Sequence, residues 1–72
     1  MELWIRSQDK LKLAKVDFIY TVEEEKGFVI YGGGPELGTY SSKQRILQIL
    51  DEIQNIKDNS DKDKITYVMP QE

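Results

Sequence analysis

Two residue types with reactive side chains are missing from this 72-residue sequence, which contains no cysteine and no histidine. Without cysteine, the chain forms no disulfide and offers no thiolate to a metal or a substrate. Without histidine, it lacks the commonest metal ligand and the usual general base at neutral pH. Composition therefore excludes a Ser-His-Asp triad, a cysteine nucleophile and a Cys/His zinc site. We expect a non-enzymatic protein that uses no metal and no cofactor.

Long apolar runs are also missing from the sequence. No run approaches the roughly 20 residues that a membrane-spanning helix requires. Met1 leads directly into an expected strand, without the charged and apolar regions of a signal peptide. Together with the lack of cysteine, these features favour a cytoplasmic protein that makes no membrane contact.

A strong excess of one charge is absent as well, because 10 basic residues stand against 13 acidic ones and the formal net charge is −3. Proteins that bind a nucleic-acid duplex concentrate basic residues on one face in order to displace counterions from phosphate. The small cluster of Lys10, Lys12 and Lys15 is more typical of a solvated strand edge. Nucleic-acid binding through these lysines is therefore a minor alternative.

The chain is short, which limits the surface it can bury and so the stability its own core can supply. The sequence predicts one domain over residues 1–72, and chains of about 60 residues bury only about 60% of the surface they expose when unfolded. Small proteins usually compensate with disulfides, a metal or a partner chain. Since disulfides and Cys/His metal sites are excluded, we expect a homo-oligomer.

Alternation of apolar and polar residues predicts five strands and one helix. The expected strands cover residues 2–7, 11–22, 28–31, 37–40 and 65–69, and the second of them carries a one-residue slip near Ala14–Lys15 that indicates a bulge. The fold class that follows is α+β, with a mostly antiparallel sheet in the order β-β-β-β-α-β. Gly27 sits in the expected turn between the second and third strands, where a positive φ is useful.

The helix is expected at about residues 42–57. Ser41 and Gln44 match the S-x-x-Q capping box, in which the serine accepts an unpaired N–H and the glutamine reaches back to the cap. One apolar stripe follows at helical spacing: Ile46, Leu47, Ile49, Leu50, Ile53 and Ile56. We expect this stripe to pack on one face of the sheet and to leave the opposite face free for self-association.

Three polar motifs favour plain loops over functional sites. Gly32–Gly34 lies between two expected strands and lacks the helix and the lysine of phosphate-binding loops. Glu23–Glu25 are consecutive, so their carboxylates point in different directions. The acidic run Asp58–Asp63 lacks the spacing of a calcium-binding loop.

Aromatic and arginine side chains are the best candidates for a binding site. Arginine forks onto carboxylate or phosphate, and aromatic rings stack on apolar groups or bases. The same residue types are enriched in protein interfaces, and they also pack in cores, which is the alternative interpretation. The candidate binding residues are Trp4, Arg6, Tyr31, Tyr40 and Arg45.

A resemblance adds context. The opening WIRSQD, the L-G-x-Y run at Leu37–Tyr40 and the helical segment from Arg45 to Ile53 resemble a group of very small uncharacterised proteins of Gram-positive bacteria and their phages. The resemblance implies a cytoplasmic accessory protein, encoded by a bacterium or by a prophage. No catalytic residue is carried over from these proteins.

Together these features predict a small interaction or regulatory protein that self-associates and contacts a host or phage protein. A first alternative is a pocket between subunits that sequesters a small anionic ligand such as a nucleotide. Nucleic-acid binding is the second alternative.

Overall fold

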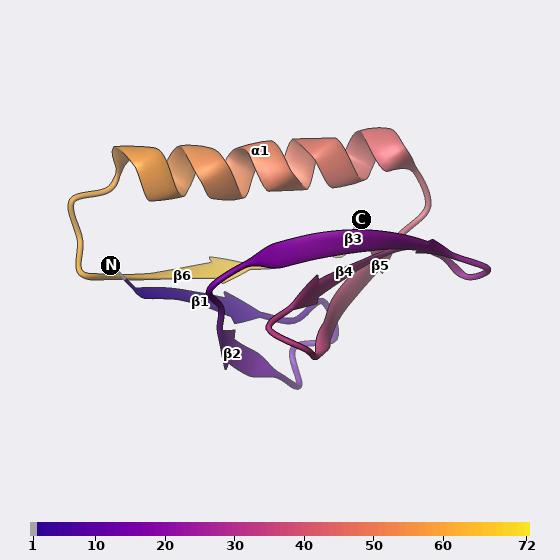
Figure 1. Ribbon diagram of the computed structural model, residues 1–72, viewed down its shortest axis with the longest axis horizontal. Helices are drawn as coiled ribbons and strands as arrows, with labels where there is room; N and C mark the ends of the chain where they lie inside the picture. Colours follow the sequence, from indigo (N-terminus) through magenta and orange to yellow (C-terminus); the bar gives the residue numbers. More distant parts are fainter. Residues whose placement is uncertain (1) are drawn as a thin grey trace.

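The structure, a computed structural model, describes residues 2–72 (Figure 1). Its elements are β1 (Glu2–Arg6), β2 (Leu13–Lys15), β3 (Ile19–Glu24), β4 (Gly27–Gly32), β5 (Glu36–Tyr40), α1 (Lys43–Asn59) and β6 (Lys64–Val68). The α+β class is confirmed, with the helix inserted before the last strand.

The strands form two three-stranded sheets, in the orders β2-β1-β6 and β3-β4-β5. Three of the four strand pairs are antiparallel, and β1 and β6 pair in parallel with Ile5 opposite Tyr67. The parallel pair exists because α1 carries the chain back across both sheets before β6 begins, as a parallel connection requires. Figure 1 shows α1 above one side of both sheets.

The expected strand over residues 11–22 is divided between the two sheets. β2 ends at Lys15 and β3 starts at Ile19, so the slip predicted near Ala14–Lys15 lies just before the chain leaves the first sheet. Val16 still donates its backbone N–H to the Leu3 carbonyl at 2.9 Å and is buried, whereas Phe18, the residue before β3, is exposed. A change of phase marks either a bulge or a change of sheet, and alternation alone does not separate them.

Ser42, and not Ser41, caps the helix. Ser42 has extended backbone angles (φ −134°, ψ 148°), and its Oγ accepts the Arg45 N–H at 3.1 Å. The predicted Ser41–Gln44 capping box is therefore wrong, because the third residue after the true cap is an arginine, which has no acceptor. The helix continues to Asn59, slightly beyond the predicted end.

We expect Ser42→Ala to lower the free energy of unfolding by about 1 kcal/mol, since one N–H of the first turn loses its partner. Ser41→Ala is the matched control, with an expected change below about 0.3 kcal/mol. Urea denaturation followed by circular dichroism measures both. Equal losses in the two variants would contradict the assignment of the cap.

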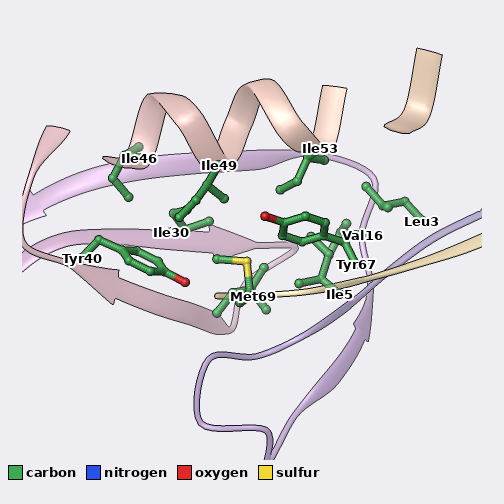
Figure 2. Close-up of a cluster of buried hydrophobic side chains, with 11 residues drawn as sticks. Leu3, Ile5, Val16, Ile30, Tyr40, Ile46, Ile49, Ile53, Tyr67 and Met69 are labelled. Carbon is green, nitrogen blue, oxygen red and sulfur yellow. The ribbon is translucent and has the colours of Figure 1, made fainter. Parts of the chain in front are cut away.

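The core lies between α1 and the two sheets. Ile46, Ile49 and Ile53 point from the helix toward Ile30 of the second sheet and Tyr67 of the first (Figure 2). The remaining buried members of the cluster are Leu3, Ile5, Val16, Leu37, Tyr40 and Met69. One helix therefore covers two sheets on one side only, and Leu47, on the flank of the predicted stripe, stays half-exposed.

Candidate interaction surfaces

The five candidate binding residues do not converge on one site. Tyr40 and Arg45 hold the C-terminal tail, Trp4 and Arg6 share the outer face of the β2-β1-β6 sheet, and Tyr31 lies on the β3-β4-β5 sheet. Each of these places has its own chemistry.

Tyr40 and Arg45 serve the structure of the tail. The Tyr40 hydroxyl donates to the Pro70 carbonyl at 2.6 Å, and its ring is buried in the core. Arg45 donates from Nε to the Glu72 backbone oxygen at 2.7 Å and from Nη1 to Gln48 Oε1 at 3.1 Å. These contacts support the structural interpretation of both residues.

A pair of glutamines, which the sequence did not single out, joins the two sheets to the tail. The Gln8 side chain donates to the Gln71 carbonyl at 2.8 Å, and Gln71 returns a hydrogen bond to the Gln8 carbonyl at 2.8 Å. Gln8 also accepts the Thr39 N–H at 2.9 Å, and its own N–H reaches the Leu37 carbonyl at 2.7 Å. These partners are far apart in sequence, so no local pattern signals them.

Three tyrosines have raised pKa values, for two reasons. Burial raises the pKa of Tyr40 to about 12. The hydrogen bond to the Glu24 carboxylate is the main reason that the pKa of Tyr31 rises to about 12. Burial first, and then a 2.6 Å hydrogen bond to Glu52 Oε1, raise the pKa of Tyr67. All three side chains therefore favour the neutral form in the folded protein.

These shifts predict a loss of stability in alkali. In the unfolded chain tyrosine ionises near pH 10, whereas the folded protein keeps these groups neutral to about pH 12. Their contribution is therefore complete below pH 10 and falls as the pH rises toward 12. Urea midpoints at pH 8, 10 and 11 measure the decline, and Tyr40→Phe should make it shallower. A midpoint that does not change between pH 8 and 11 would contradict the prediction.

Trp4 and Arg6 form the centre of an exposed face on the β2-β1-β6 sheet. The strand register places Arg6 between Leu13 and Val68, which are 57% and 51% exposed. Trp4 lies one row further, and its indole N–H donates to Glu2 Oε1 at 3.0 Å. Arg6 uses Nε to donate to the Lys10 carbonyl at 2.7 Å. We call Trp4, Arg6, Leu13 and Val68 the tryptophan face.

Tyr31 belongs to an aromatic row on the second sheet. Its ring stacks on Tyr20 with centroids 5.3 Å apart, and Tyr20 stacks on Phe18 at 5.6 Å. The Tyr31 hydroxyl donates to Glu24, which fixes the ring at one end of the row. Phe18, just before β3, and Tyr20, on the edge strand β3, are exposed, so the row is open to solvent at this edge of the sheet.

Two open grooves separate α1 from β3. One, of about 460 Å³, lies beside Phe18, Ile19 and Lys57, and the other, of about 360 Å³, lies beside Thr21 and Glu23. Leu50 borders both grooves. The grooves arise because a single helix does not cover the full width of the sheet.

The glycine loop is a turn between β4 and β5. Gly33 and Gly34 have φ values of 67° and 125°, and the Gly32 N–H donates to the Pro35 carbonyl at 3.1 Å. Elsewhere in residues 2–72, no three acidic side chains are grouped so as to hold a metal ion. The helix α1 is too short and too polar to cross a membrane.

Comparison with known proteins gives no match: no family model matches the sequence, and no curated protein or solved structure is significantly similar to it.

Proposed function

We propose that this chain is a small, non-enzymatic, cytoplasmic interaction protein that self-associates and binds another protein through the tryptophan face. The observation that carries the proposal is the exposure of Leu13 and Val68 on both sides of Arg6, with Trp4 in the next row. Tryptophan and arginine dominate the binding energy of many protein interfaces, particularly when apolar neighbours exclude water around them.

The charges around the tryptophan face suggest the character of the partner. Lys15 and Thr66 flank Trp4, and Lys64 lies opposite Glu2 at the end of the same face. Basic residues thus outnumber acidic ones around an apolar centre. We infer a partner surface that presents apolar side chains bordered by carboxylates, because complementary charge speeds association and excludes wrong partners.

Several observations favour a protein partner over a small anionic ligand or a nucleic acid. Arg45 is occupied by the tail, and it lies away from Arg6, so the two arginines do not form one pocket. Lys12 is paired with Asp9 at 3.6 Å, which weakens the lysine cluster as a phosphate site. The resemblance to small proteins of Gram-positive bacteria and their phages agrees with an accessory role, and it supports a cytoplasmic setting.

Affinity capture from the native host tests the tryptophan face. We expect a specific protein to be enriched by the wild type and by Lys62→Glu, a control on an exposed loop, and to be lost with Arg6→Glu. Arg6→Glu reverses the central charge of the face at an exposed position, so the fold should survive. If Arg6→Glu retains the same protein with unchanged affinity, the tryptophan face is not the binding site.

A nucleotide panel in a thermal-shift assay separates the first alternative from the proposal. A protein that binds none of these ligands should show no change in melting temperature. A rise of several degrees with one nucleotide would indicate preferential binding to the folded state, and would favour the small-ligand alternative.

A further inference from the structure

The strand β3 offers a long unpaired edge. It pairs only with β4 in its sheet and spans six residues, whereas β2, at an edge of the other sheet, has three. Proteins usually protect such edges with lysine, proline or a covering segment. β3, with the sequence IYTVEE, contains neither lysine nor proline. By contrast, β5 has Gln8 hydrogen-bonded alongside it. The edge of β3 is thus available to another strand.

We propose that β3 pairs antiparallel with β3 of a second copy, with Thr21 opposite Thr21, so that the two β3-β4-β5 sheets join into one six-stranded sheet. This inference rests on the proposed self-association and names its surface and its register. A two-fold axis perpendicular to the sheet passes beside Thr21 and leaves both helices on the same side.

The hydroxyl of Thr21 supports this position of the axis. Within residues 2–72, the Thr21 Oγ1 is the one buried side-chain oxygen or nitrogen that lacks a hydrogen-bond partner. Buried polar groups without partners are rare in folded proteins and usually have a reason. With Thr21 opposite its own copy, the hydroxyl gains a partner when the side chain turns from its buried position toward the strand edge, and facing threonines are a stabilising pair in antiparallel sheets.

The exposed apolar side chains of β3 match in the same register. Tyr20 faces Val22 of the second copy, and the two-fold axis repeats this pair on the other side. Both side chains are substantially exposed in the single chain, and aromatic rings opposite β-branched residues stabilise a strand pair. At the seam between the copies, the aromatic row of Phe18, Tyr20 and Tyr31 in each copy meets Val22 and Glu24 of the other.

Charge complementarity agrees with this register. Ile19 faces Glu23 of the second copy, and Lys57 lies beside Ile19 in the groove under α1. Glu23 points to the same side of the sheet, since it borders the other groove. Neither Lys57 nor Glu23 has an ion-pair partner among residues 2–72. The two-fold axis brings Lys57 of each copy toward Glu23 of the other, so the dimer contains this ion pair twice.

Neighbouring registers that keep both helices on one side lose the pairs between Tyr20 and Val22 and between Ile19 and Glu23. Centring the pair on Tyr20 places Asp17 opposite Glu23, which sets like charges against each other. Centring it on Val22 places Tyr20 opposite Glu24, so an aromatic ring loses its apolar partner. The register centred on Thr21 sets Phe18 opposite Glu24 and Asp17 opposite Glu25. It is the one of the three that places Tyr20 opposite Val22, and the one that places Ile19, beside Lys57, opposite Glu23.

Disulfide trapping tests the register, because the chain has no cysteine of its own. Facing Cβ atoms in an antiparallel pair approach to about 4.5–5.5 Å, and diagonal ones stay about 7–8 Å apart. In an antiparallel pair, facing residues alternate between hydrogen-bonded and non-hydrogen-bonded positions, and the non-hydrogen-bonded ones lie closer. After mild oxidation, we therefore expect a covalent dimer from either Thr21→Cys or the double variant Tyr20→Cys/Val22→Cys, depending on which of the two positions is non-hydrogen-bonded. Val22→Cys alone is the matched control, since its two copies are diagonal.

Sedimentation equilibrium on charge variants tests the ion pairs. We expect Lys57→Glu and Glu23→Lys each to raise the dimer Kd about fivefold, and the double variant to restore it to within about twofold of the wild type. Val22→Lys should raise the Kd at least about tenfold, because it removes the partner of Tyr20 and adds repulsion. Leu11→Lys, an apolar-to-lysine change in a distant exposed turn, should leave the Kd unchanged.

The outcomes separate the two proposals. A concentration of about 100 µM is well above the dissociation constant of a stable dimer. A wild-type protein that is monomeric at this concentration overturns both this inference and the proposed self-association. A dimer that resists trapping at both cysteine positions and ignores the charge swap keeps self-association but overturns the β3 pairing. Trapping together with rescue by the double variant supports the register.

Discussion

Replacing Ile49 with alanine is expected to cost about 3–4 kcal/mol of unfolding free energy, more than any other single change considered. Ile49 has no exposed surface and sits at the middle of α1, where it packs between the two sheets (Figure 2). Removing its outer carbons leaves a cavity that closes only in part, because Ile46 and Ile53 hold the neighbouring turns of α1 against the two sheets. A domain of this size holds about 4–10 kcal/mol in total, so about half of its stability is at risk.

Graded variants distinguish a cavity from a general effect of mutation. Ile49→Val removes one methyl group and should cost about 1 kcal/mol. Leu11→Ala removes aliphatic carbons from a side chain that is 84% exposed, and it should cost less than about 0.5 kcal/mol. Urea unfolding at one fixed, low protein concentration measures all three, because self-association would otherwise add to the apparent stability. A similar midpoint for Ile49→Ala and Leu11→Ala would contradict the core assignment.

Gly27→Ala is expected to lower the unfolding free energy by about 3 kcal/mol, through two separate costs. Gly27 begins β4 with a φ of 130°, a region that residues with a side chain rarely adopt. A Cβ at this position would also lie 2.7 Å from the Tyr40 carbonyl oxygen on β5. Because that oxygen belongs to the backbone of a paired strand, it moves only if the β4–β5 pairing is disturbed.

Gly34→Ala is the matched control, since it shares the strained φ but not the contact. Gly34 has a φ of 125°, and a Cβ there meets nothing within 4 Å. Its cost should be about 1–2 kcal/mol, the backbone part alone. Thermal or urea unfolding of both variants gives the difference, which reports the contact with Tyr40. Equal losses would mean that β5 gives way without cost at this position.

Local patterns predicted the helix and most of the strands, because these patterns reflect contacts within one element. The stripe that contains Ile46, Ile49 and Ile53 repeats at the helical period, and those three side chains are buried. The cap was missed by one residue because Ser41 and Ser42 are both good caps, and the choice depends on the backbone angles at the end of β5. Gly27 was expected to need a positive φ, and this is confirmed.

The candidate binding residues show where sequence reasoning stops. Trp4 and Arg6 were chosen by residue type, and they share one exposed face because both belong to the same side of one strand. Tyr40 was chosen on the same grounds and is buried, since its hydroxyl finds the Pro70 carbonyl thirty residues later in the chain. Residue type alone does not tell an exposed aromatic from a buried one.

The sequence by itself determined the α+β class, the place of the helix and the exclusion of cysteine and histidine chemistry, because composition and periodicity are local properties. Only the tertiary structure decided that the second apolar segment serves two sheets, that β6 returns beside β1, and that the edge of β3 stays open. Those outcomes depend on how one helix shares its buried side between two sheets. Contacts between residues far apart in the chain settle that division, and no short stretch of sequence records them.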